Sequence, residues 1–152
     1  MSASNDLTFR RLDDEEMGMA DGLVSMVNRE DPKSESWGVT PAGGRPAGEA
    51  FGMFMRDALA GVVWLGAERT GCVEILALAM PRGRWGMGLI PWLAGRVADL
   101  ARDRGAKELL VRIDAGGAAL GEELEDSLFS GPKAEDEGYP CGEWRRPVHL
   151  PE

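Results

Sequence analysis

The chain has 152 residues, of which 43% are hydrophobic and 28% charged, and its net charge at pH 7 is −9. These values are typical of a single soluble globular domain, which we expect to span residues 1–152, and they exclude a low-complexity chain. Because 17 basic residues stand against 26 acidic ones, the charge balance argues against nucleic acid as a partner. A negative surface instead favours cationic ligands such as amines.

Two cysteines, Cys72 and Cys141, and a single histidine, His149, limit the chemistry that the chain can carry. Two cysteines do not make a disulfide scaffold, and no C-x-x-C pair or histidine cluster marks a metal site. The N-terminus has no apolar stretch of signal-peptide length, and the longest apolar run, 73–80, is too short to span a bilayer. We therefore expect a cytoplasmic protein with neither a metal nor a membrane partner.

The first thirty residues predict a strand followed by a helix. Residues 1–6 form a polar, frayed start, and the alternation at 7–10 predicts a strand. Asp13 and Glu16 have the spacing of a capping box, in which each side chain binds the backbone of the other residue. Apolar residues then recur at helical spacing, which predicts a helix over 14–29.

A long loop follows at 31–50, in a stretch rich in Pro, Gly and Ser. Loops of this length inside a compact domain are usually functional or disordered. Trp37 lies within the loop, although disordered linkers rarely carry tryptophan. It is therefore either a substrate-binding residue or an anchor that holds the loop to the core.

Three strand candidates come next in close order, at 51–56, 62–67 and 72–80. The connections between them, 57–61 and 68–71, are short. Short connections predict antiparallel neighbours, because a parallel pair needs a long crossover. The third strand, CVEILALAM, is apolar on both faces, as expected of a central strand that is covered on both sides.

A Gly-rich turn, PRGRWGMG, leads from this strand into a predicted helix over 88–104. Residues 107–113, KELLVRI, then predict a strand that runs parallel to the earlier one and completes a βαβ unit. A helix over 118–129 is expected next. It overlaps the acidic run 122–137, and such a run usually marks a solvated face.

The C-terminal segment 130–152 has the weakest pattern. One or two strands are expected within 138–148, with Trp144 packed inward.

The turn PRGRWGMG has the properties of an anion site. A Gly-rich turn at a helix N-terminus presents unpaired backbone N–H groups and the positive end of the helix dipole, which suit a phosphate. Gly83, Gly86 and Gly88 allow close approach of a ligand, and Arg82 and Arg84 add positive charge. The turn is neither a P-loop nor a Rossmann fingerprint, because its glycine spacing fits neither motif.

The order of these elements resembles the GNAT superfamily of acyl-CoA-dependent N-acetyltransferases. The likeness is strongest over 73–113 and extends over roughly 7–130. The family's loop pattern is [Gln/Arg]-x-x-Gly-x-[Gly/Ala]; its last two positions fall on Gly86 and Gly88, and its first falls on Gly83, which departs from it. The resemblance implies an α/β (α+β) fold, with a mixed, mostly antiparallel sheet of about six or seven strands and helices on both faces.

The resemblance also implies acetyl-CoA as the acyl donor. The two parallel strands would splay to admit it, with the loop amides on the pyrophosphate and the strand backbone along the pantetheine arm. The implied cofactor-binding residues are Leu78, Ala79, Met80, Arg82, Gly83, Arg84, Trp85, Gly86, Met87, Gly88 and Leu89.

Glu74 is the only charged residue in its apolar strand. Strand alternation predicts that it shares a face with Leu76, Leu78 and Met80, and apolar neighbours make a carboxylate bind protons more tightly, as a general base requires. Some GNAT enzymes carry a glutamate near the start of this strand that deprotonates the attacking amine. The resemblance therefore implies that Glu74 is the catalytic base; the alternative is a strand-end residue that faces solvent or pairs with an arginine.

The family's usual general acid is a tyrosine on the helix that follows the fifth strand. Counting on from Val111, that position falls near 121–122, where this chain has no tyrosine. Tyr139 is the only tyrosine and therefore the candidate acid; otherwise Ser127 or water would protonate the leaving thiolate.

Three functions remain open at this stage. The first is transfer of an acetyl group to a primary amine of a small molecule, of a protein lysine or of a protein N-terminus. The second is a catalytically silent domain that senses acyl-CoA. The third is an interaction module whose acidic face at 122–137 docks a basic partner. Many members of the family form homodimers, so a homodimer is also possible.

Overall fold

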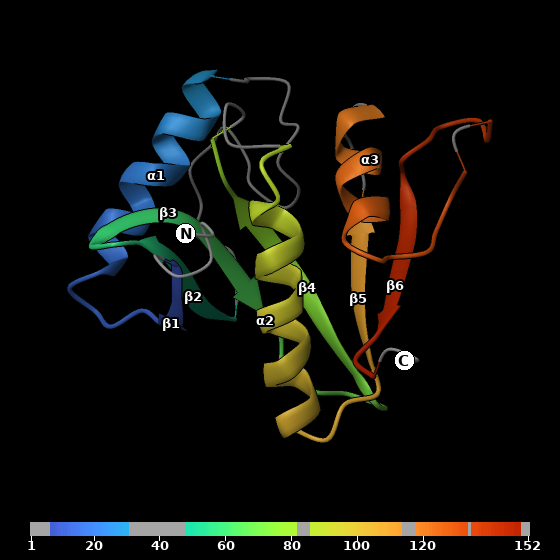
Figure 1. The fold of residues 1–152 in the computed structure, drawn as a ribbon, viewed down its shortest axis with the longest axis horizontal. Coiled ribbons are helices and arrows are strands. Elements are labelled where there is room, and N and C mark those ends of the chain that lie inside the picture. Colours follow the sequence, from blue (N-terminus) through green and yellow to red (C-terminus); the bar gives the residue numbers. More distant parts are fainter. Residues whose placement is uncertain (1–6, 31–47, 82–85, 114–117, 134, 150–152) are drawn as a thin grey trace.

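The computed structural model describes residues 7–30, 48–81, 86–113, 118–133 and 135–149. The chain order is strand, helix, three strands, helix, strand, helix, strand, as the sequence predicts (Figure 1). The helices are α1 (Met17–Glu30), α2 (Leu89–Asp103) and α3 (Ala118–Asp126). The strands are β1 (Leu7–Arg11), β2 (Glu49–Met55), β3 (Ala58–Leu65), β4 (Cys72–Ala79), β5 (Glu108–Ile113) and β6 (Gly142–Pro147).

The six strands form one sheet in the order β1-β2-β3-β4-β5-β6. Every neighbouring pair is antiparallel except β4 and β5, which are parallel and are joined through α2. This arrangement confirms the expected α/β (α+β) fold with a mixed, mostly antiparallel sheet. None of the helices formed by the described residues is long and apolar enough to cross a membrane.

The sheet separates two apolar cores, because successive side chains of a strand point to opposite faces. Val62 and Trp64 of β3 pack with the inner residues of α1. Val63 and Leu65 belong to the other core, which includes α2 and the inner residues of α3. The helices therefore cover both faces of the sheet, α1 on one and α2 with α3 on the other (Figure 1).

The capping box before α1 forms as predicted. The Asp13 backbone N–H donates to Oε1 of Glu16 over 3.1 Å, and the Glu16 backbone N–H donates to Oδ1 of Asp13 over 2.8 Å. Two backbone donors at the helix start are thus satisfied by side chains, which is why α1 begins here.

The connection predicted at 57–61 is wrong, because Arg56 and Asp57 alone form the turn and β3 already begins at Ala58. Arg56 adopts a left-handed φ of 56°, which allows a two-residue hairpin turn. Ala60 is an extra residue between the pairs Met53–Gly61 and Phe54–Leu59. Alanine and glycine have low strand propensity, but pairing with β2 outweighs that preference.

Candidate functional site

Strand β4 carries one extra residue, Leu76. Trp64 of β3 pairs with Ala77, whereas the next β3 residue, Leu65, pairs with Ile75, so Leu76 has no partner on β3. Such a β-bulge bends the strand and increases its twist.

The bend separates β4 from β5. The two strands pair only over Cys72–Ile75 and Glu108–Val111, and beyond those residues they diverge (Figure 1). We call this opening, between residues 76–79 of β4 and 112–113 of β5, the β4–β5 fork. Within the described part of the chain, the edge of β4 that faces the fork has no strand partner on β5. Its backbone groups are therefore available to bind an extended ligand.

The bulge also changes which side chains share a face of β4. Ile75 lies in the core under α2, and after the extra residue it is Leu78 and Met80 that lie there. Glu74 precedes Ile75 and so faces the opposite side, the side on which Leu76 packs in the α1 core. The prediction that Glu74 shares a face with Leu78 and Met80 is therefore wrong, because it assumed unbroken alternation.

On β5 and β6, charged side chains of the face that Glu74 shares pair with one another. Arg145 binds Glu108 over 2.5 Å and Glu143 over 3.3 Å, and Arg112 lies 3.4 Å from Glu143. Among the described residues, no cation pairs with the carboxylate of Glu74, which is half-buried. Within this part of the chain, Glu74 therefore remains a candidate to accept a proton from a bound amine.

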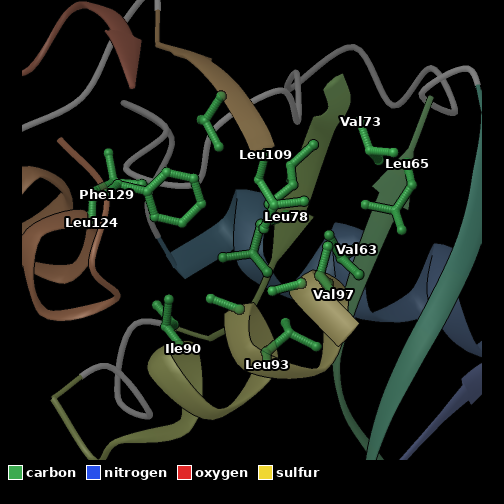
Figure 2. Packing of buried hydrophobic residues seen from close by; sticks show 14 of the residues in the cluster. Val63, Leu65, Val73, Leu78, Ile90, Leu93, Val97, Leu109, Leu124 and Phe129 are labelled. Atoms are coloured by element: carbon green, nitrogen blue, oxygen red, sulfur yellow. The ribbon is translucent and has the colours of Figure 1, made fainter. Parts of the chain in front are cut away.

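A small cavity lies beside the fork, between β4, α2 and the end of α3. It is narrow, with about 10 Å³ of room, which is space for about one water. Figure 2 shows Leu78 pointing into this region from β4, with Ile90 and Leu93 approaching from α2 and Leu124 and Phe129 from the α3 side.

Of the described residues that line the cavity, Ser127 alone carries a hydroxyl. The side chain is 1% exposed, and none of the described residues makes a hydrogen bond to its Oγ. A buried hydroxyl normally has a partner, so Ser127 holds an unused donor beside the fork. The Arg146 guanidinium fixes the backbone nearby, because Nη1 donates to the Ser127 carbonyl over 3.2 Å.

The fork opens next to the N-terminus of α2. Gly86 and Gly88 have φ values of 81° and 78°, a left-handed conformation that side chains other than glycine rarely adopt. Gly88 is the N-cap of α2, and as a glycine it has no side chain with which to cap the helix. The first turn of α2 therefore presents the positive end of the helix dipole at the place where the sequence predicts an anion site.

An acidic side chain already occupies part of this end. The Gly86 backbone N–H donates to Oε1 of Glu123, with an N···O distance of 2.5 Å. Glu123 is 6% exposed, so the prediction of a solvated face over 122–137 is wrong at this residue. Helical spacing contained the signal, because Glu123 falls on the inner stripe of α3 together with Leu120, Leu124 and Ser127.

Tyr139 lies against α3 at Gly121, although neither residue 121 nor residue 122 is itself a tyrosine. A Cβ added to Gly121 would lie 2.1 Å from the Tyr139 hydroxyl oxygen, so the phenol lies where a side chain at Gly121 would be. Burial and the negative charges of Glu125 and Glu122 raise the pKa of Tyr139, which keeps the hydroxyl protonated at neutral pH.

Tyr139 packs against one flank of α3, at Gly121, and Glu123 belongs to another flank of the same helix. Gly121 and Glu123 are two residues apart, which corresponds to a rotation of roughly 200° around a helix. The structure therefore brings Glu123, and not Tyr139, to the loop at Gly86.

The other predicted site residues fall into two groups. Leu78, Ala79 and Met80 lie at the end of β4 from which the chain leads to residues 86–89, so they share one end of the sheet with the start of α2. Trp37, Arg82, Gly83, Arg84 and Trp85 lie outside the described residues.

No protein-family model matches this sequence, and no curated protein matches it. Solved structures do match. An IAA acetyltransferase from Bacillus cereus aligns with a TM-score of 0.63 at 14% identity, over 93% of this chain and 99% of that one. A putative acetyltransferase from Salmonella typhimurium with its cofactor acetyl-CoA aligns with a TM-score of 0.62 at 14% identity, over 95% of each chain.

A third solved structure is a putative acetyltransferase of the GNAT family from Desulfovibrio desulfuricans. It aligns with a TM-score of 0.64 at 19% identity, over 94% of this chain and 99% of that one. These three matches span nearly the whole of each chain. This chain therefore has the fold of the GNAT acetyltransferases.

Proposed function

We propose that this protein transfers an acetyl group from acetyl-CoA to a primary amine of a small molecule, of a protein lysine or of a protein N-terminus. The observation that carries the proposal is the β4–β5 fork, which opens beside a helix N-terminus whose N-cap is a glycine. An extended pantetheine arm needs backbone partners along a strand edge, and a pyrophosphate needs amide donors. The fork and the start of α2 offer both at one end of the sheet.

The residues present fit acetyl-CoA in chemical type. The backbone of Leu78, Ala79 and Met80 would hold the pantetheine arm, and the amides of 86–89 the pyrophosphate. Acetyl-CoA supplies a thioester, whose carbonyl carbon accepts the amine nitrogen as the C–S bond breaks. A backbone N–H near Leu78 would polarise that carbonyl, as an oxyanion hole does.

Two protons move in this reaction, and the chain has a group for each. Glu74 would accept the proton that the amine loses, directly or through water, because its carboxylate has no cation partner among the described residues. The thiolate that leaves would take a proton from water, either directly or through the Ser127 hydroxyl beside the fork, which would regain its own proton from water. The net charge of −9 favours a cationic amine as the acceptor.

A second candidate function is a silent sensor that binds acyl-CoA without turnover. The observation that favours it is the position of Tyr139, whose hydroxyl contacts Gly121 on another flank of α3 from the one that reaches Gly86. In this case Tyr139 would serve packing alone.

Replacing Glu74 by Gln separates these two functions. We expect Glu74→Gln to lower the turnover number about 10²- to 10⁴-fold at neutral pH, as is usual for loss of a general base, with little change in acetyl-CoA affinity. The measurement is chromatographic detection of coenzyme A released in the presence of a panel of monoamines, polyamines and peptides with free lysines.

The matched control is Glu137→Gln, which removes the same charge from an exposed residue and should leave the rate unchanged. Wild-type turnover by Glu74→Gln would exclude Glu74 as the base. Tight binding of acetyl-CoA without release of coenzyme A for any amine would favour the sensor.

A further inference from the structure

The contact between Gly86 and Glu123 joins two segments that the chain separates by 37 residues. The donor belongs to the loop that precedes α2, and the acceptor is a buried side chain of α3. Because the acceptor is a carboxylate, this hydrogen bond is a charge-assisted one. Glu123 therefore acts as an internal anion at the loop.

The first turn of α2 increases the attraction for an anion at this place. Gly88 provides no side-chain cap, and the first turn contains no acidic residue. Pro91 has no N–H, so the remaining donors come from the backbone of neighbouring residues. No acidic residue in the first turn of α2 thus compensates the positive end of the helix dipole. The carboxylate of Glu123, from α3, lies there instead.

A carboxylate and a phosphate cannot both accept the single N–H of Gly86. Both are negative, and like charges held at one site repel each other. An anionic ligand that binds this loop must therefore displace Glu123 or be weakened by it.

We propose that Glu123 competes with the pyrophosphate of the acyl donor for the amide of Gly86 and so holds the free protein in a self-inhibited state. This inference rests on the proposed function, because it takes acyl-CoA as the ligand of the fork. When the cofactor binds, its pyrophosphate replaces the Glu123 carboxylate as the acceptor for the Gly86 N–H. Part of the free energy of cofactor binding is needed to displace Glu123 from the loop. The protein therefore binds the cofactor more weakly than it would if Glu123 did not occupy the loop.

The test compares Glu123→Gln with Glu122→Gln by titration calorimetry with coenzyme A. The amide oxygen that Glu123→Gln introduces can still accept from Gly86, so the replacement removes the charge and keeps the hydrogen bond. Glu122 is the exposed neighbour on the same helix, and its replacement changes the net charge equally. We expect Glu123→Gln to bind coenzyme A at least about tenfold more tightly than wild type and Glu122→Gln to stay within about twofold, given the cost of like charges at an interface.

A neutral fragment shows whether charge is the cause. Pantetheine carries no pyrophosphate, so its affinity should be the same for wild type and Glu123→Gln. Thermal unfolding followed by circular dichroism checks that both variants stay folded.

The outcomes distinguish the two proposals. If all three proteins bind coenzyme A equally, or if Glu123→Gln binds more weakly than wild type, Glu123 does not inhibit binding, and the proposed function stands. If wild type and both variants fail to bind coenzyme A at millimolar concentration, the proposed function is overturned and this inference with it. If Glu123→Gln binds coenzyme A more tightly than wild type and Glu122→Gln does not, the result supports both the proposed function and this inference.

Discussion

Deletion of Leu76 is expected to leave the protein folded and to abolish its binding of acetyl-CoA. Leu76 is the extra residue of the β4 bulge, since Ile75 and Ala77 pair with consecutive residues of β3. Without it, Ile75, Ala77, Leu78 and Ala79 alternate strictly between the two cores to which they already belong. The deletion therefore straightens β4 without moving any other side chain to the wrong face.

A straight β4 would continue to pair with β5 beyond Ile75, which closes the β4–β5 fork. The affinity for acetyl-CoA should fall at least about 100-fold, because the extended arm of the ligand loses its backbone partners. Calorimetry measures the affinity, and circular dichroism reports whether the chain is folded.

Leu76→Ala is the matched control, because it removes the same side chain but keeps the extra residue. It should retain affinity within a few-fold of wild type. Wild-type affinity in the folded deletion variant would show that the bulge does not create the binding site.

Trp144→Ala is expected to destabilise the protein by about 3–5 kcal/mol, the usual cost of truncating a buried tryptophan. Trp144 is 0% exposed, and its indole N–H donates to the Pro140 carbonyl over 2.8 Å. The ring packs edge-on to Tyr139, with centroids 6.1 Å apart. It also lies so close to Gly131 that an added Cβ there would lie 2.5 Å from the indole.

The loss should extend to β5, because Trp144 lies opposite Val111 in the β5–β6 pair and β5 is one arm of the fork. Urea unfolding followed by circular dichroism measures the free energy of unfolding. Trp144→Phe is the control: it keeps most of the apolar volume and loses one hydrogen bond, worth about 1 kcal/mol. If Trp144→Ala lowers the free energy of unfolding by less than about 1 kcal/mol, the space left by the indole has been filled by its neighbours. The stability of β6 would then not depend on this ring.

The order of strands and helices could be predicted from the sequence because the signals that set it are local. The capping box at Asp13 and Glu16, the helical stripe of α2 and the short connections around β3 each depend on residues close in the chain. The connection after 51–56 was placed wrongly because Ala and Gly give little strand signal, and pairing across the sheet decided the outcome.

The bulge at Leu76 left no trace in the sequence. Strand β4 is apolar on both faces, so a shift of phase by one residue replaces one apolar side chain by another. Only Glu74 could have revealed it, and a single charged residue does not define a period. The face of Glu74 was therefore predicted wrongly, although its place on the strand was predicted correctly.

Contacts between segments far apart in the chain could not be predicted from the sequence either. The sequence indicates an anion site before α2, but not that Glu123 from α3 reaches Gly86. Nor does it indicate that Tyr139 lies against Gly121. Each contact depends on where α3 packs relative to α2 and β6, which no local pattern determines.

The most direct test of the central claim, that the β4–β5 fork binds acyl-CoA, is a titration of isotope-labelled wild-type protein with acetyl-CoA followed by amide NMR. We expect saturable shifts at micromolar to millimolar ligand for the amides of 76–79 in β4 and 86–89 at the start of α2, the two segments that border the fork. No shift up to millimolar ligand, or shifts confined to residues away from both segments, would contradict it.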